Sequence, residues 1–240
     1  MAATSILITG GNRGKSPHHN YQMFLTMFIG LGLGLVKHYL ALPNQVVVAG
    51  FRNPAHLTCK ELSTLPKDAT SSIVIVQIES GSKSSAIAAV DTLQTKYGID
   101  RLDVIIANAG IATAWPTVAD ASVEDMLEHY RVNVIGPVVL FQATLPLLSK
   151  AANGKFAVMS SSRRHPRKIY FENEKLVVLA TDPGWVRTEM GNVEAVALGF
   201  DTAEIEVDES IRGVTKVIKE ATREESSGRF WIYIGEESKW

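Results

Sequence analysis

Short apolar runs alternate along the chain with longer segments in which apolar residues recur every three or four positions. The short runs are rich in β-branched residues and predict strands at 5–9, 45–49, 72–77, 104–107, 155–160, 176–180 and 230–234. Several of these runs are apolar throughout, as expected for strands of a parallel sheet that is covered on both faces.

The longer segments between the runs predict amphipathic helices. One spans 82–97 and carries apolar residues at helical spacing, namely Ile87, Val90 and Leu93. Another is expected to start at Ser122, whose hydroxyl can cap the backbone near Asp125. A third enters at Asp208. Strands that alternate with helices in this way predict an α/β fold, a doubly wound parallel sheet of the Rossmann type. We expect one domain over residues 1–240.

Composition excludes several classes of protein. Hydrophobic residues make up 46% of the 240 residues and the net charge is −1, so neither nucleic acid nor an anionic membrane is an expected partner. Cys59 is the only cysteine, which rules out an intrachain disulfide. The start of the chain lacks the basic segment of a secretion signal, and the apolar run 23–36 is shorter than the roughly 20 residues of a membrane span. We therefore expect a cytoplasmic protein. The adjacent His18 and His19 lack further ligands at a suitable spacing, so no metal site is expected.

The stretch ITGGNRGKS, residues 8–16, is close to a P-loop but does not meet its spacing. A P-loop needs a glycine five positions before the Gly-Lys-Ser triplet, and Thr9 stands there instead. A dinucleotide-binding turn fits better. When residues 15–30 are removed, the sequence becomes strand, TGGNRGLG, helix, strand, in which glycines let backbone amides approach a pyrophosphate. This turn resembles the TGxxxGxG motif of the short-chain dehydrogenase/reductase family.

Further motifs of that family follow in order. ANAG at 107–110 resembles its NNAG element, RVNVIGP at 131–137 its helix-borne asparagine, and DPGWVRT at 182–188 its PGxVxT loop. The C-terminal SGRFWIYIGEESKW is similar to the end of carbonyl-reductase-like members. The whole set most resembles fungal ketoreductases of the norsolorinic acid type, and it covers nearly all of the chain outside 15–30.

The resemblance implies an NADP(H)-dependent ketone or carbonyl reductase. Arg52, directly after the second strand, stands where NAD-using relatives carry an acidic residue, and its guanidinium can pair with a 2′-phosphate. Arg13 offers a second cation, although a solvated surface arginine remains the alternative for both. The residues implied in cofactor binding are Gly10, Asn12, Arg13, Gly14, Gly32, Arg52, Glu79, Asn108, Ala109, Gly110, Pro183, Gly184, Val186 and Thr188.

The family's catalytic set is incomplete in this chain. Ser161 matches the serine that orients the carbonyl, and Asn133 matches the asparagine that supports a proton relay through water. The tyrosine that donates the proton should be followed four residues later by a lysine that eases the transfer. None of the six tyrosines has a lysine at that distance. We therefore expect impaired activity on a small-molecule carbonyl substrate, for which small carbonyls and polyketides both remain open.

The segment that should carry this pair is short. Two adjacent parallel strands need a crossover of about a dozen residues or more, usually containing a helix. Only 161–174 is available between the fifth and sixth strands, and it holds a proline and little apolar pattern. The family's crossover at this point holds a full helix of several turns, so the resemblance implies a truncated crossover with a deletion near 162–168. Because this helix also builds the dimer interface of many relatives, its truncation argues against a homo-oligomer.

Two functions remain open on this basis. The first is a reductase by descent, impaired in this chain. The second is a non-catalytic dinucleotide-binding or scaffold protein, which keeps the glycine turn and has lost the Tyr/Lys pair.

Residues 15–30 form an anomalous insertion in the glycine turn, and we predict that they are a retained intron or a gene-model error. Gly-Lys-Ser can be encoded with the splice-donor sequence GTAAGT, and Ile29-Gly30 with an acceptor AG. Removing these codons preserves the frame. The alternative is a genuine loop, such as a flap beside the substrate or a membrane. Sequencing of the transcript should show the segment spliced out. Abundant mRNA that retains it would contradict this prediction.

Overall fold

Seven strands form one sheet in which every neighbouring pair is parallel, in the order β3-β2-β1-β4-β5-β6-β7. The computed structural model describes residues 3–10, 30–53, 61–112, 119–160 and 172–238. The strands are β1 (Thr4–Thr9), β2 (Gln45–Phe51), β3 (Ser72–Gln77), β4 (Val104–Ala107), β5 (Lys155–Met159), β6 (Val177–Asp182) and β7 (Phe230–Ile232). All seven predicted strands are confirmed, with ends that differ by a residue or two, and so is the doubly wound Rossmann-type fold.

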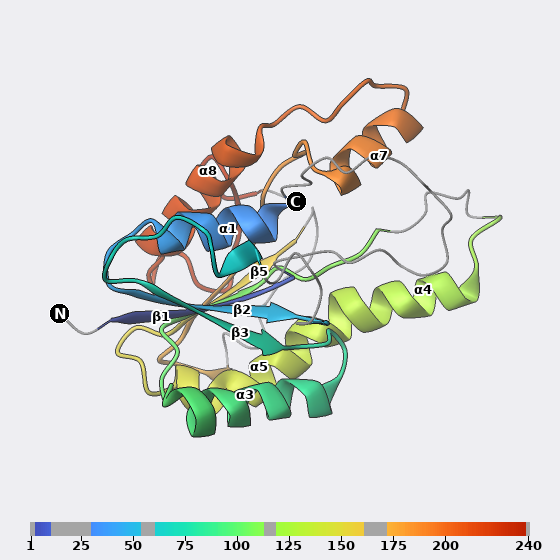
Figure 1. Ribbon diagram of the computed structural model, residues 1–240. Coiled ribbons are helices and arrows are strands. Elements are labelled where there is room, and N and C mark those ends of the chain that lie inside the picture. The colour runs from blue at the N-terminus through green and yellow to red at the C-terminus, as the bar shows by residue number, and fades with distance from the viewer. Residues whose placement is uncertain (1–2, 11–29, 54–60, 113–118, 161–171, 239–240) are drawn as a thin grey trace.

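Helices cover both faces of the sheet (Figure 1). They are α1 (Leu31–Leu40), α3 (Lys83–Tyr97), α4 (Val123–Tyr130), the π-helix η1 (Arg131–Ile135), α5 (Gly136–Leu148), α7 (Glu189–Ala197) and α8 (Val207–Glu220). The helices α1 and α8 pack together on one face, and α3 and α5 pack together on the other. The predicted disruption of the glycine turn and the predicted deletion near 162–168 fall within 11–29 and 161–171, outside the described residues.

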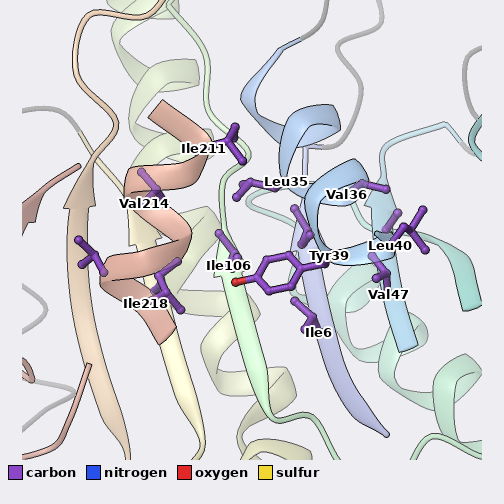
Figure 2. Close-up of a cluster of buried hydrophobic side chains, with 14 of the residues drawn as sticks. Ile6, Leu35, Val36, Tyr39, Leu40, Val47, Ile106, Ile211, Val214 and Ile218 are labelled. Carbon is purple, nitrogen blue, oxygen red and sulfur yellow. The ribbon is translucent and has the colours of Figure 1, made fainter. Parts of the chain in front are cut away.

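The face under α1 and α8 is a continuous apolar cluster (Figure 2). Every second residue of the central strands points into it, so Ile6 lies beside Val47, and Ile106 lies beside the next inward residue of β1, Ile8, beneath the two helices. Tyr39 of α1 is 8% exposed and extends across these side chains. Burial raises the pKa of Tyr39, which keeps its phenol neutral. Alternate residues of the same strands belong to this cluster and to the cluster on the opposite face, so the strands are buried on both sides.

The opposite face is built around Phe156, which is fully buried and packs edge-to-face on Phe141 of α5 with ring centroids 5.1 Å apart. The predicted helix α3 is confirmed, but its apolar residues at helical spacing are not all buried. Ile87 of α3 is 52% exposed, while Ala86, Ala89 and Leu93 are buried. The small alanines let α3 approach the sheet closely, and this turns the larger Ile87 toward solvent.

The α4–η1–α5 segment is one continuous helical stretch with a π-helical turn in its middle. Ser122 caps α4 as predicted, because its hydroxyl accepts the Asp125 amide at 3.0 Å. Pro137 has no N–H, so the carbonyl of Asn133 cannot receive the usual α-helical bond from four residues on. This missing donor accounts for the local π-helix. Within the described residues, 123–148 is the one helical stretch long and apolar enough to cross a membrane, and much of it is buried against the sheet.

Replacing Phe156 with alanine tests the core. We expect Phe156→Ala to lower the free energy of unfolding by about 3–5 kcal/mol, because it removes a buried aromatic side chain and leaves a cavity. Ile87→Ala is the matched control on the same side of the sheet and should change stability by less than about 0.5 kcal/mol. Urea denaturation followed by circular dichroism measures both. Equal losses in the two variants would contradict the packing described here.

Candidate functional site

The strand order reverses between β1 and β4, and this reversal opens a crevice at the carboxyl edge of the sheet. Arg52 follows β2 and Asn108 follows β4, so both lie at this edge on either side of β1. Ligands of open α/β sheets bind outside such a point. The fold therefore brings together two residues that the sequence separates by more than fifty positions.

Hydrogen bonds fix the end of β1 to the turn after β4. The buried Thr9 hydroxyl accepts the backbone amides of both Asn108 and Ala109 at 3.2 Å. In return, the Asn108 side-chain amide donates to the Thr9 carbonyl at 2.9 Å and approaches the Gly10 carbonyl at 3.4 Å. These contacts hold the ANAG turn against the start of the glycine turn.

Gly10 is the residue at which β1 ends and the glycine turn begins. Its φ of +71° lies in the left-handed region that favours glycine. A Cβ atom there would come within 2.7 Å of the Ala109 Cα. The Gly10 amide donates to the Gly50 carbonyl at 3.1 Å, which ties this corner to β2 as well. A side chain at position 10 would therefore strain the left-handed backbone and clash with Ala109.

The helix α1 begins at the same edge of the sheet. Gly30 occupies its N-cap without a side-chain hydrogen bond, and its first turn contains no acidic residue. The N-terminus of α1 thus presents backbone amides and the positive end of the helix dipole, as an anion requires. Gly32 is buried in the first turn, and Gly34 packs directly on Ile211 of α8.

Asn133 lies in η1, where its side chain clamps the segment that follows the ANAG turn. Its Oδ1 accepts the Ile111 amide and its Nδ2 donates to the Ile111 carbonyl, both at 2.8 Å. A Cβ on Gly110 would lie 3.3 Å from this side chain. Asn133 is also the residue that the resemblance implies in a proton relay through water, a role that stays a prediction. The structure therefore places Asn133, Asn108 and Gly110 in one connected unit.

The loop after β6 forms the other end of the crevice. The Gly184 amide donates to the Asp182 carboxylate at 2.8 Å, and Gly184 has a φ of +79°. The Pro183 carbonyl accepts the Ser210 hydroxyl at 2.7 Å. Val186 is buried, and Thr188 caps α7 by accepting the Gly191 amide at 3.2 Å. That bond uses an oxygen lone pair of Thr188 and leaves its hydroxyl proton able to donate to a ligand.

An ion-pair network, which the sequence analysis missed, borders Glu79 at the β3 side of the crevice. Arg131 of η1 donates to both carboxylate oxygens of Glu128, at 2.7 and 2.8 Å, and to the Ser80 carbonyl at 3.2 Å. It also lies 3.7 Å from the Glu79 carboxylate. The hydrogen bond from Arg131 lowers the pKa of Glu128, and the positive charge of Arg52 contributes to the same shift. The three-residue spacing of Glu128 and Arg131 was the available signal.

Apolar side chains gather on and after α7, beside the loop that follows β6. Val193, Val196, Leu198 and Phe200 are exposed, and Trp185 packs edge-to-face on Phe200 with centroids 5.4 Å apart. Among the described polar atoms, Trp185 Nε1 is one that is buried without a hydrogen-bond partner. These side chains, named here the apolar wall, lie on the segment that follows the loop after β6.

Four of the sequence-predicted site residues lie outside the described residues: Asn12, Arg13, Gly14 and Ser161. Ser160, the neighbour of Ser161, directly follows β5 and donates its backbone amide to the Thr181 carbonyl at 2.9 Å. This places the end of β5 at the carboxyl edge with the other site residues. The described residues contain no group of three or more His, Cys, Asp or Glu side chains that could hold a metal ion.

Comparison with known proteins decides the family. The family model for short chain dehydrogenases matches residues 26–169. This chain belongs to the short-chain dehydrogenase/reductase family. A norsolorinic acid ketoreductase of Emericella nidulans is 36% identical over 229 residues, covering 85% of this chain and 87% of the relative. A norsolorinic acid ketoreductase of Dothistroma septosporum is 33% identical over 257 residues, covering 96% and 90%.

Solved structures agree with the fold of this short-chain dehydrogenase. The NADPH-bound carbonyl reductase from chicken fatty liver superposes with a TM-score of 0.77 at 28% identity, and all of both chains is covered. The carbonyl reductase Sniffer of D. melanogaster gives a TM-score of 0.78 at 24% identity, with 99% of this chain and 100% of the other covered. The resemblance read from the motifs is therefore confirmed at the level of family and fold.

Replacing Thr9 with valine tests the β1–β4 connection. Thr9→Val keeps the shape of the side chain but removes the hydroxyl acceptor of the Ala109 amide and one of the two acceptors of the Asn108 amide, which also donates to the Ile106 carbonyl, so we expect a loss of about 1–3 kcal/mol of stability. Thr92→Val, on the exposed side of α3, is the matched control and should stay within about 0.5 kcal/mol of the unaltered chain. Thermal unfolding measures both. A stability equal to that of the control would show that the Thr9 bonds do not hold the turn.

Proposed function

We propose that this chain is an NADP(H)-binding member of the family, descended from ketone and carbonyl reductases and impaired in catalysis. The observation that carries the proposal is the corner made by Thr9, Gly10 and Asn108, with Arg52 at the same edge of the sheet. It combines a left-handed glycine, a tightly held turn and a cation beside a helix N-terminus.

The described residues fit a dinucleotide from one end of the crevice to the other. Arg52 would pair with the 2′-phosphate, and Glu79 would lie at the adenine side. The N-terminus of α1, where Gly30 makes no side-chain cap, would suit the pyrophosphate, because its amides and dipole favour an anion. The loop 183–188, with the free hydroxyl proton of Thr188, would hold the nicotinamide end. When bound, the nicotinamide would supply the hydride that reduces a carbonyl carbon.

The substrate proposed is a small-molecule carbonyl compound of polyketide-like character. Two relatives above 30% identity are named norsolorinic acid ketoreductases. The apolar wall formed by Trp185, Phe200 and the exposed residues of α7 lies beside the proposed nicotinamide end, and such side chains suit a flat, largely apolar molecule. A cytoplasmic location remains part of the proposal.

Catalysis is the step we propose to be impaired. Asn133 would support a proton relay and Ser161 would orient the carbonyl, as the motifs imply. However, no tyrosine anywhere in the sequence is followed four residues later by a lysine. Without that lysine a phenol of pKa near 10 is a poor proton donor and acceptor near neutral pH. The same observation favours the second candidate function, a dinucleotide-binding or scaffold protein without turnover.

Cofactor titration separates these functions. We expect saturable enhancement of NADPH fluorescence and a weaker response to NADH. Arg52→Ala should weaken NADPH binding by about 10- to 100-fold, since a hydrogen bond to a charged group contributes roughly 1.5–3 kcal/mol, and should change NADH binding little.

A ketone-reduction assay with a panel of aliphatic and aromatic ketones completes the test. Binding with turnover at the background rate supports the impaired or non-catalytic form. Turnover well above background would overturn the impairment. Absence of NADPH binding by a folded chain would overturn the whole assignment.

A further inference from the structure

Two carboxylates lie close to the place where the proposed function, on which this inference rests, puts a 2′-phosphate. Glu79 follows β3, the strand beside β2, and the Arg52 carbonyl accepts the side-chain amide of Gln77 at 3.1 Å. Glu128 of α4 and Glu79 both pair with Arg131, which brings the two carboxylates together at this edge, and the positive charge of Arg52 contributes to the lowered pKa of Glu128. A phosphate dianion that approached Arg52 would therefore meet two negative charges as well as one positive charge.

Arg131 is arranged to offset these two carboxylates. Its guanidinium forms a bidentate pair with Glu128 and contacts Glu79 at 3.7 Å. Bidentate pairs of this kind have fixed geometry and are among the stronger charge-assisted contacts. His129 lies next to Glu128 but directs its ring nitrogen Nδ1 to the Asp125 carbonyl at 2.7 Å. Arg131 thus provides the direct hydrogen bonds to the Glu128 carboxylate.

The position of Arg131 is fixed by close packing. A Cβ on Gly81, which has a φ of +83°, would come within 2.7 Å of both the Cγ and the carbonyl oxygen of Arg131. A Cβ on Gly136 would come within 3.2 Å of Ser80. The turn after β3 therefore lies directly against η1, and the Ser80 carbonyl accepts a further hydrogen bond from Arg131 at 3.2 Å. The backbone and the Cγ of Arg131 are therefore held close to this turn.

We propose that Arg131 is a positioning residue for cofactor choice, which engages Glu128 and Glu79 so that they do not compete with a 2′-phosphate for Arg52. Arg131 does not touch the phosphate in this scheme. It sets the local charge, and through that charge the preference for a 2′-phosphorylated adenine nucleotide over the unphosphorylated one.

Calorimetric titration of the full chain with adenosine 2′,5′-bisphosphate and with 5′-AMP tests this, because neither probe requires turnover. The unaltered chain should prefer the bisphosphate. Arg131→Gln should reduce that preference by about three- to tenfold, the effect of one uncompensated charge on a nearby dianion in a solvent-rich setting. Arg131→Lys keeps the charge and should retain most of the preference.

A variant at Glu128 should change the preference for the bisphosphate in the opposite direction. Glu128→Gln removes a carboxylate and should raise the preference about two- to threefold, and Glu128→Gln combined with Arg131→Gln should return it close to the original value. Arg101→Gln is the matched control, since Arg101 pairs with Asp103 at the amino edge of the sheet, and it should leave the ratio unchanged. Circular dichroism confirms folding of each variant. If Arg131→Gln fails to fold, Glu128→Gln still tests the inference, because it should raise the preference for the bisphosphate.

The outcomes that overturn the inference differ from those that overturn the proposed function. Equal weakening of both nucleotides by Arg131→Gln would mean that Arg131 only supports the turn. A lower preference in Glu128→Gln would also overturn it. If the unaltered chain binds neither nucleotide, the cofactor assignment itself fails. If it binds both equally, the assignment of the 2′-phosphate to Arg52 fails, and the role of Arg131 with it.

Discussion

The connection between the end of β1 and the end of β4 is the constraint on which the crevice depends. One buried hydroxyl, on Thr9, accepts two backbone amides of the ANAG turn, and Asn108 returns hydrogen bonds to the first residues of the glycine turn. The strand order reverses between β1 and β4. These bonds therefore fix the positions of the two strand ends that border the crevice. The clamp between Asn133 and Ile111 then extends the same order to η1.

The fold was largely predictable because parallel strands buried on both faces must be apolar along their whole length. Runs such as those of β2 and β4 show this plainly, and their ends differ from the prediction by little. The face of α3 was not predictable in the same way. Periodicity favours the largest apolar residues for burial, but close approach of a helix to a sheet favours small ones, and Ala86 and Ala89 are buried where Ile87 is not.

The site was predictable where a residue's role depends on the backbone near it. Gly10, Asn108 and Gly184 belong to tight turns, so local motifs identify them, and the structure brings the first two into contact. The role of Arg131 was not predictable, because it depends on the turn after β3, some fifty positions away, lying against η1. The π-helical turn had a signal that was overlooked. Pro137 stands four residues after Asn133, and a proline at that spacing removes one α-helical donor.

The central place of β1 also has a consequence for assembly of the nascent chain. Ser5 donates its amide to the carboxylate of Asp103, 98 positions away, so one long side of β1 cannot pair until β4 has left the ribosome. At a synthesis rate of about 5–20 residues per second this delay lasts roughly 5–20 s. During it β1 can pair with β2 alone, and its open backbone edge is a template for other extended chains. The arrangement that later forms the crevice therefore makes early protection by chaperones an advantage during translation.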